Sequence, residues 1–101
     1  MSTNLQIGTP FTKSFATTQY TLSTTPSLIL DFPDSPSTRR VFVLVQNTSA
    51  TETIQVCGNA TDTVGVVLPP LSPFTIDTYN GSLYAFANSG TPTVNVTTAS
   101  V

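Results

Sequence analysis

Few side chains in this sequence could carry out acid–base or nucleophilic chemistry. The chain contains no histidine, and Cys57 is its single cysteine. Histidine is the commonest general base and the commonest metal ligand. Its absence rules out a Ser-His-Asp triad and a Cys-His pair, and it argues against a zinc site. The composition therefore predicts that the protein is not an enzyme and has no metal or cofactor.

Carboxylates are the remaining candidates for catalysis, because a pair of them can hydrolyse glycosidic bonds. The two that lie closest in sequence, Asp31 and Asp34, belong to a proline-rich segment. Aspartate in such a segment commonly accepts a hydrogen bond from the nearby backbone of a turn. We favour this structural interpretation, which also applies to Asp62 and Asp77, and we keep a hydrolase as a minor alternative.

Cys57 ends a segment in which apolar and other residues alternate. Ile54 and Val56 are expected on one face of a strand, with Gln55 and Cys57 on the other. A free cysteine usually behaves as a small buried apolar side chain. A reactive thiol would need a nearby cation, and none is close in the sequence. We expect Cys57 to be buried and unreactive.

Arg39 and Arg40 are the only adjacent residues with charges of one sign. Two arginines make a meagre phosphate-binding surface, and a net charge of -2 predicts no nucleic-acid partner. No basic cluster suited to an anionic membrane is present either. We expect the two arginines to be solvated or paired with Asp31 or Asp34. The alternative is an anchoring role in a subunit interface, where arginine is enriched.

The tyrosines offer one further binding possibility. Tyr20, Tyr79 and Tyr84 could form a platform on which a sugar or a base stacks. However, Tyr84 and Phe86 alternate with aliphatic residues in Leu83–Ala87, so both faces of that segment are apolar. This pattern favours the core or a subunit interface over an open binding surface.

The scarcity of charge favours a protein that works in an assembly. Charged residues make up 8% of the chain, against about 25% in typical soluble domains. Such a surface has little charge repulsion to keep the protein monomeric. The residues that we expect at an interface with another subunit or a partner are Arg39, Arg40, Tyr84, Phe86, Phe11 and Phe15.

Arg39–Asn47 is the segment around which the fold is expected to form. Its apolar run, Val41–Val45, is rich in residues that favour strands and is bounded by polar residues. Such a run predicts a central strand that is covered on both faces. This run and all others are too short to span a membrane.

The remaining segments predict a single domain without helices. The strands should lie within Phe11–Leu22, Leu28–Phe32, Arg39–Asn47, Thr53–Cys57, Val64–Leu68, Phe74–Asp77, Leu83–Ala87 and Thr93–Thr97. Their spacing predicts an all-β fold, an antiparallel β-sandwich or jelly roll of about eight short strands. The choice between a jelly roll and another Greek-key sandwich stays open. We expect residues 1–10 to form a polar N-terminal arm and residues 11–101 to form the β-sandwich domain.

Several turns can be expected from glycine and proline. Asn80-Gly81 is the strongest signal for a β-hairpin, and Thr53–Cys57 is expected to return from the central strand. Gly65 indicates a bulge or a close approach of two backbones. The N-terminal residues lack the pattern of a signal peptide, so synthesis in the cytoplasm is expected.

Residues 39–98 resemble small β-sandwich proteins that tailed bacteriophages encode as virion components. A basic residue and an apolar strand ending in Gln-Asn are followed by a short strand, a glycine-containing apolar segment, a proline-bearing corner, a Leu-Tyr-Ala strand, a Ser-Gly turn and a Thr/Val strand. In this sequence the matching pieces are Arg40–Asn47, Thr53–Val56, Val64–Pro70, Ser82–Ala85, Ser89–Thr91 and Thr93–Val96. The corner, Pro69–Pro73, is richer in proline than usual, and the residues before Arg39 fall outside the pattern.

The resemblance implies a structural role in a virus particle. The expected function is that of a capsid decoration or cement protein, located on the capsid surface, that binds the phage major capsid protein and stabilises the head shell. It further implies a homo-oligomer, most simply a trimer. The alternative is an accessory module of a phage tail or fibre that binds a carbohydrate or a receptor.

Overall fold

The computed structural model describes residues 14–33 and 39–100. Within these residues the chain forms strands and no helix, which confirms the all-β fold class. The strands are β1 (Ser14–Thr21), β2 (Ser27–Leu30), β3 (Arg40–Asn47), β4 (Ile54–Cys57), β5 (Val66–Leu68), β6 (Pro73–Asp77), β7 (Leu83–Ala87) and β8 (Thr93–Ser100).

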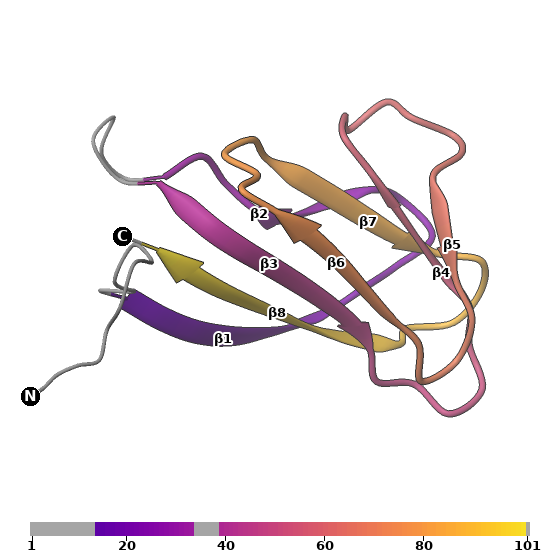
Figure 1. Ribbon diagram of the computed structural model, residues 1–101. Coiled ribbons are helices and arrows are strands. Elements are labelled where there is room, and N and C mark those ends of the chain that lie inside the picture. The colour runs from indigo at the N-terminus through magenta and orange to yellow at the C-terminus, as the bar shows by residue number, and fades with distance from the viewer. Residues whose placement is uncertain (1–13, 34–38, 101) are drawn as a thin grey trace, which may run out of the picture.

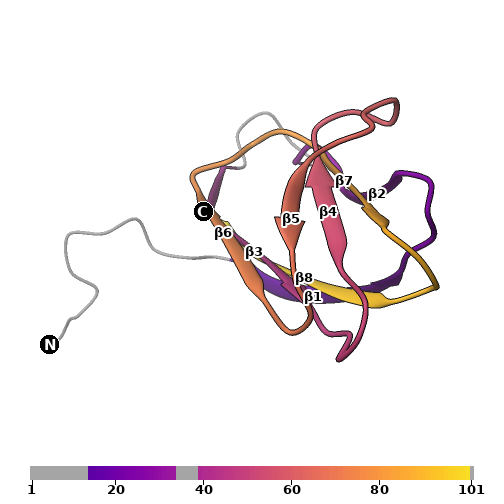
Figure 2. The same cartoon turned by 90° about the vertical axis from the view of Figure 1, so that its right-hand side faces the viewer.

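The strands form two antiparallel sheets that face each other (Figures 1 and 2). The first sheet has the order β1-β8-β3-β6, and the second has the order β2-β7-β4-β5. The pairs β1·β8, β2·β7, β3·β6 and β4·β5 are therefore nested, as in a long hairpin folded over itself. This nesting is the jelly-roll arrangement, so the fold is the jelly roll among the sandwich topologies that the sequence left open.

The core lies between the two sheets and is mostly aliphatic. Alternation along β3 points Val43 and Val45 inward, where both side chains are fully buried. Because successive side chains of a strand point to opposite faces, each strand contributes every second residue to this core. The buried cluster consists of Leu22, Ile29, Val43, Val45, Ile54, Val56, Leu68, Leu83, Ala85, Ala87, Val94 and Val96.

The expectation for Arg39–Asn47 is confirmed in part. β3 is central in its sheet, since β8 and β6 flank it. The prediction that it is covered on both faces is wrong, because Phe42 and Leu44 are only half-buried and Gln46 is exposed. A two-layer sandwich covers only one face of each sheet, so these residues lie on the outer surface of the protein.

Two predicted chain reversals are crossings between the sheets. Asn80-Gly81 does not form a β-hairpin, because β6 and β7 belong to different sheets. The usual Asn-Gly hairpin turn needs a positive φ at both residues, and neither residue has one. Likewise β4 does not return alongside β3 but enters the second sheet. Turn-forming residues therefore predicted the positions of these loops correctly. The prediction that the strands on either side of each loop pair with each other was wrong.

Other boundaries differ from the prediction by a few residues. β2 ends before Phe32, β5 begins after Val64, and β8 continues to Ser100. The close approach expected at Gly65 is confirmed, because a Cβ atom there would lie 2.3 Å from the backbone oxygen of Val56. The proposed arm, residues 1–10, lies outside the described residues.

Candidate functional site

The carboxylates do not converge on a catalytic or metal-binding centre within the described residues. No group of three or more His, Cys, Asp and Glu side chains that could hold a metal ion occurs there. Asp31 Oδ1 accepts a hydrogen bond from the Phe32 N–H at 2.8 Å, and Asp62 Oδ2 accepts one from the Asn59 N–H at 3.2 Å. Both side chains therefore stabilise local backbone, as expected of aspartate in turns. Asp34 lies outside the described residues.

Cys57 is buried, as predicted, with 7% of its surface exposed. Its thiol donates a hydrogen bond to the Asn59 carbonyl oxygen at 3.5 Å. Burial raises the pKa of the thiol above its ordinary value, and the negative charge of Asp62 raises it further, while the Asn59 contact opposes the shift. A protonated thiol is a poor nucleophile, so this environment suits a structural role.

Arg39 and Arg40 diverge at the start of β3. Arg39 is exposed, whereas Arg40 is 7% exposed and hydrogen-bonded to the backbone. The Arg40 N–H donates to Asn80 Oδ1 at 2.8 Å, and its Nη1 donates to the Gly81 carbonyl at 2.8 Å. Its Nη2 donates to the Asp31 carbonyl. Arg40 thus fastens the end of β2 and the β6–β7 crossing to the central strand.

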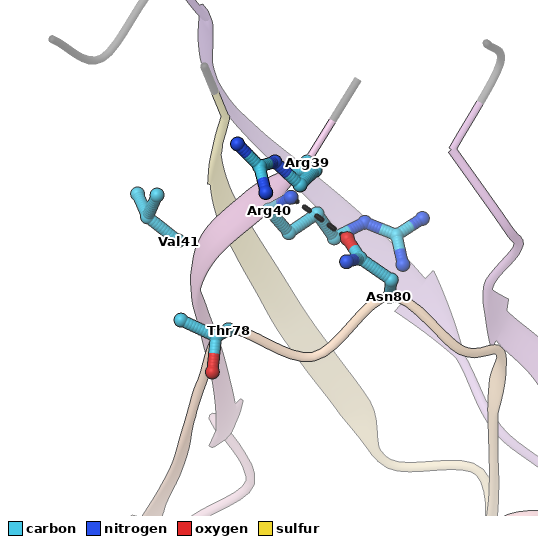
Figure 3. A pocket seen from close by; sticks show the side chains of 5 residues that line it. All are labelled: Arg39, Arg40, Val41, Thr78 and Asn80. Carbon is cyan, nitrogen blue, oxygen red and sulfur yellow. Dashed lines mark hydrogen bonds between the residues drawn. The ribbon is translucent and has the colours of Figure 1, made fainter. Parts of the chain in front are cut away.

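A surface pocket of about 360 Å³ lies at this corner (Figure 3). Its lining residues are Arg39, Arg40, Val41, Thr78 and Asn80. Figure 3 shows the two guanidinium groups turned to different sides of β3. Because the two charges do not converge, the pocket lacks the paired donors that clamp a phosphate or a carboxylate.

The aromatic candidates are divided between the two outer faces. Phe15 projects from the outer face of the first sheet with 72% of its surface exposed. Tyr84 is half-buried and Phe86 is buried on the outer face of the second sheet. Phe11 lies outside the described residues. The predicted interface residues therefore do not form one surface.

The outer face of the first sheet carries an apolar patch, and Asp77 of β6, which is paired with Phe42, lies at its border. Ala99 of β8 is paired with Phe15 of β1 on one side and with Phe42 of β3 on the other, which places all three in one row. The next row contains Leu44 beside Thr97. We call Phe15, Phe42, Leu44 and Ala99 the outer apolar patch. Sequence reasoning found Phe15 and missed the rest, because it assumed that both faces of the central strand were buried.

The outer face of the second sheet is also partly apolar. Leu28 is paired with Tyr84, which is paired in turn with Cys57. At the opposite edge Val67 is 56% exposed. In the described strands, both outer faces are thus mainly apolar or uncharged, and Asp77 of β6 is a charged residue on the outer face of the first sheet.

The tyrosines do not form a common stacking platform. Tyr20 and Tyr79 both pack against the core, and the Tyr79 hydroxyl donates to the Ser82 carbonyl at 2.6 Å. Tyr84 lies on the outer face of the second sheet. Because a stacking site needs several exposed rings on one surface, this arrangement does not favour sugar or base binding.

Asn47 is a buried polar residue with a structural role that the sequence analysis did not predict. It is 1% exposed, and its Nδ2 donates to the carbonyl oxygens of Glu52, Leu68 and Pro69 at 2.8, 3.0 and 3.1 Å. Its Oδ1 accepts the Ser49 N–H at 3.0 Å. The available signal was its alternation with Val43 and Val45, which places it on the buried face of β3.

Comparison with known proteins leaves the fold and its surfaces as the basis for inferring function. No protein-family model matches the chain, and no curated protein matches it in sequence. Within the described residues, no helix is both long and apolar enough to cross a membrane. The surfaces that remain for interpretation are the outer apolar patch, the apolar residues of the second sheet and the Arg39 corner.

Proposed function

We propose that this protein is a structural component of a virus particle, a decoration protein that binds the head shell of a tailed bacteriophage and stabilises it. The observation that carries the proposal is the outer apolar patch. Phe42 and Leu44 belong to the unbroken apolar run Val41–Val45, yet only the opposite face of β3 is covered by the second sheet. Apolar surface that the fold leaves partly exposed, as at Phe15, Phe42 and Leu44, is typical of protein interfaces.

The rigid jelly roll suits a binding role of this kind. Its core is complete between the two sheets, so the outer faces can make contacts without disturbing the fold. Viral capsid domains commonly have this topology, which supports the proposal by analogy. The resemblance of residues 39–98 to phage virion proteins supports it independently.

Stabilisation of a shell would follow from mass action. A protein that binds the assembled shell and not its separated subunits shifts the equilibrium toward the shell. Repetition of the same contact over many copies multiplies a small gain at each site. We further propose that the protein is made in the host cytoplasm and acts as a homo-oligomer on the capsid surface.

A tail or fibre module that binds a carbohydrate is the weaker proposal. Lectins can also have a jelly-roll topology, but such a module needs aromatic rings gathered at an exposed site. Tyr20 and Tyr79 instead pack against the core, whereas Tyr84 lies on the outer face of the second sheet. A glycan array would test this alternative, and specific binding would favour it.

The decisive experiment measures binding to head shells. The purified protein is mixed with shells assembled from the major capsid protein of the phage that encodes it, and the shells are sedimented. We expect the wild-type protein and the exposed-loop control Thr61→Glu to sediment with the shells. Phe42→Glu should remain in the supernatant while keeping its far-UV circular dichroism spectrum.

Light scattering on each purified protein without shells gives the mass of its oligomer. This measurement tests the trimer that the resemblance implies. A protein that stays monomeric at high concentration and does not sediment with the shells would overturn the proposal.

A further inference from the structure

The edge strands of the two sheets differ in how well they are protected against pairing with another chain. β5 has 3 residues, and β2 has 4 residues and an irregular register with β7. β6 begins at Pro73 and ends at Asp77. Short length, irregular pairing, proline and charge are the features by which proteins block strand addition at an edge.

β1 has none of these protective features. It is an edge strand of 8 residues that pairs with β8 over its whole length without a register shift. Its sequence, SFATTQYT, contains no proline and no charged residue. Figure 1 shows β1 running along the border of the first sheet, with no strand on its other side. Its free edge is therefore open to strand addition within the described part of the chain.

The hydrogen bonds around β1 identify which of its backbone groups face this open edge. The Leu22 N–H donates to the Pro92 carbonyl at 2.8 Å, so the register makes Leu22 and Pro92 a hydrogen-bonded pair. Such pairs alternate with non-hydrogen-bonded pairs in antiparallel strands. The residues whose backbone groups point away from β8 are therefore Phe15, Thr17, Gln19 and Thr21.

Two further contacts support this assignment. The hydroxyl oxygens of Thr17 and Thr97 lie 2.9 Å apart, which fits the closer side chains of a non-hydrogen-bonded pair. On the other side of β8, the Thr48 N–H donates to the Thr93 carbonyl at 3.2 Å. Thr93 and every second residue after it therefore face β3, which leaves the alternate residues of β8 to bond β1.

We propose that the open edge of β1 binds β1 of a second copy of this chain, in an antiparallel pair with two-fold symmetry. One register uses all the outward-facing backbone groups. It pairs Phe15 with Thr21 of the second copy, and Thr17 with Gln19 of the second copy. The two-fold axis then passes between Thr18 and its counterpart, and the two first sheets join into one continuous sheet.

The second copy is the favoured occupant because the edge is complementary to itself. An antiparallel pair of identical strands satisfies the same donors and acceptors on both sides. Since β1 carries no charge, no like charges oppose each other across the axis. The pairing also continues the outer apolar patch, because Phe15 of each copy lies on the same outer face of the joined sheet.

This inference rests on the self-association included in the proposed function and names the contact that produces it. It predicts a dimer as the unit of assembly, in place of the trimer that the resemblance implies. Shell binding and dimer register are measured separately, so the failure of either proposal can be recognised.

A disulfide test checks the register. In the proposed pair, the Thr18 residues of the two copies form a non-hydrogen-bonded pair with Cα atoms about 4.5 Å apart, a separation that permits a disulfide. Thr18→Cys should therefore form a covalent dimer under mild oxidation. Ala16→Cys is the matched control, because it is exposed on the same face of β1. Its thiols would lie four residues apart along the strand, about 13 Å, and should not cross-link.

A charge-exchange test checks the pairing of Thr17 with Gln19. In the double variant Thr17→Lys/Gln19→Lys, the positive charges at positions 17 and 19 of the two copies oppose each other across the axis. In Thr17→Glu/Gln19→Glu, negative charges oppose each other in the same way. We expect each variant alone to dimerise at least tenfold more weakly than the wild type in sedimentation velocity. A mixture of the two should form a heterodimer. Thr75→Lys, on the edge strand β6, should dimerise like the wild type.

The outcomes separate the possible occupants of the edge. A covalent dimer with Thr18→Cys, none with Ala16→Cys, and heterodimers in the charge mixture would support the proposal. A monomeric wild-type protein would overturn it and would leave the chain's own N-terminal residues or a different partner as the other candidate occupants of the edge. An oligomer that cross-links equally at both positions, or a trimer, would overturn the proposed pairing and leave the shell-binding proposal standing.

Discussion

At the scale of single residues, buried polar groups hold the ends of the sandwich together. Asn47 connects the end of β3 to the chain entering β4 and to the chain leaving β5. Arg40 does the same at the opposite end of β3, through the Gly81 and Asp31 carbonyls. A buried polar group is favourable only when its hydrogen bonds are made, and both side chains find backbone partners. The two ends of the central strand are thus fixed by side-chain contacts to distant segments.

Asn47→Asp should destabilise the protein strongly. The substitution replaces the donor amide with a carboxylate oxygen that faces three carbonyl oxygens. We expect a loss of about 3–5 kcal/mol in the free energy of unfolding, as for a buried polar group that loses its partners. Urea denaturation provides the measurement. Gln46→Glu, at the exposed neighbouring position, should change stability by less than about 0.5 kcal/mol, and an equal loss in both variants would contradict this role for Asn47.

Cys57 should react slowly with Ellman's reagent in the folded protein. Burial and Asp62 raise the pKa of its thiol, so little thiolate is available at neutral pH. In the folded protein the Cys57 thiol also keeps its proton at pH values at which the same thiol in the unfolded chain has begun to ionise. Stability should therefore fall as the pH rises above the ordinary thiol pKa of 9.0.

The pH-dependent part of this prediction is tested by comparison with Cys57→Ser. Urea denaturation from pH 8 to 10.5 should show a steeper loss of stability in the wild type than in the variant. Identical pH profiles would show that folding does not raise the pKa of the Cys57 thiol. Labelling at the same rate with and without urea would show that the thiol is accessible in the folded protein.

At the scale of elements, pairing depends on contacts that local sequence does not encode. The strand segments were predictable, because alternating apolar residues are bounded by turns. Their partners were not, since β3 lies beside β6 and β8 while its neighbours in sequence enter the other sheet. The β4–β5 pair is an exception, because these strands are adjacent both in sequence and in the sheet. Its geometry depends on Gly65, where the chain passes close to Val56.

Gly65→Ala should destabilise the β4–β5 pair. An added Cβ would lie 2.3 Å from the Val56 carbonyl oxygen, and backbone atoms cannot move away as a flexible side chain could. We expect a loss of about 2–4 kcal/mol in the free energy of unfolding, as for an atom forced into a space that is already filled. Gly58→Ala is the matched control in the same connection, because its Cβ would meet no atom within 4 Å.

The control should leave stability unchanged or raise it by up to about 1 kcal/mol, since alanine restricts the unfolded chain. Thermal unfolding followed by circular dichroism compares the two variants. Similar melting temperatures would mean that the backbone near Gly65 can shift without cost.

At the scale of the whole molecule, each sheet has one face in the core and one on the surface. This division makes neighbouring residues of β3 play opposite roles. Val45 is fully buried in the core, whereas Leu44 belongs to the outer apolar patch. The apolar character of Leu44 and Phe42 contributes little to the monomer core, and the proposed function assigns it to contact with other proteins.

Glutamate at these two positions should separate folding from assembly. Val45→Glu buries an unpaired carboxylate in the core, which we expect to cost more than about 4 kcal/mol and to unfold the protein. Leu44→Glu places the charge on the surface and should change stability by no more than about 1 kcal/mol. Circular dichroism and urea denaturation measure the fold, and sedimentation with head shells measures assembly. An unfolded Leu44→Glu would contradict the assignment of the outer face.

The amino-acid sequence by itself determined the class of the fold and most of its strands. Alternation of side chains and the placement of proline and glycine are local properties, so β3, β4, β6 and β7 could be located closely. The burial of Cys57 and the close approach at Gly65 followed from the same local patterns.

Only the tertiary structure decided which strands pair, which face of β3 is open, and which edge is unprotected. The sequence of Val41–Val45 is apolar on both faces, but the number of layers that cover a strand depends on how the whole chain folds over itself. The roles of Asn47 and Arg40 depend on carbonyl groups far away in the sequence. The candidate surfaces, the outer apolar patch and the free edge of β1, appear only after the nested pairing of the jelly roll has placed β1 at the border of its sheet.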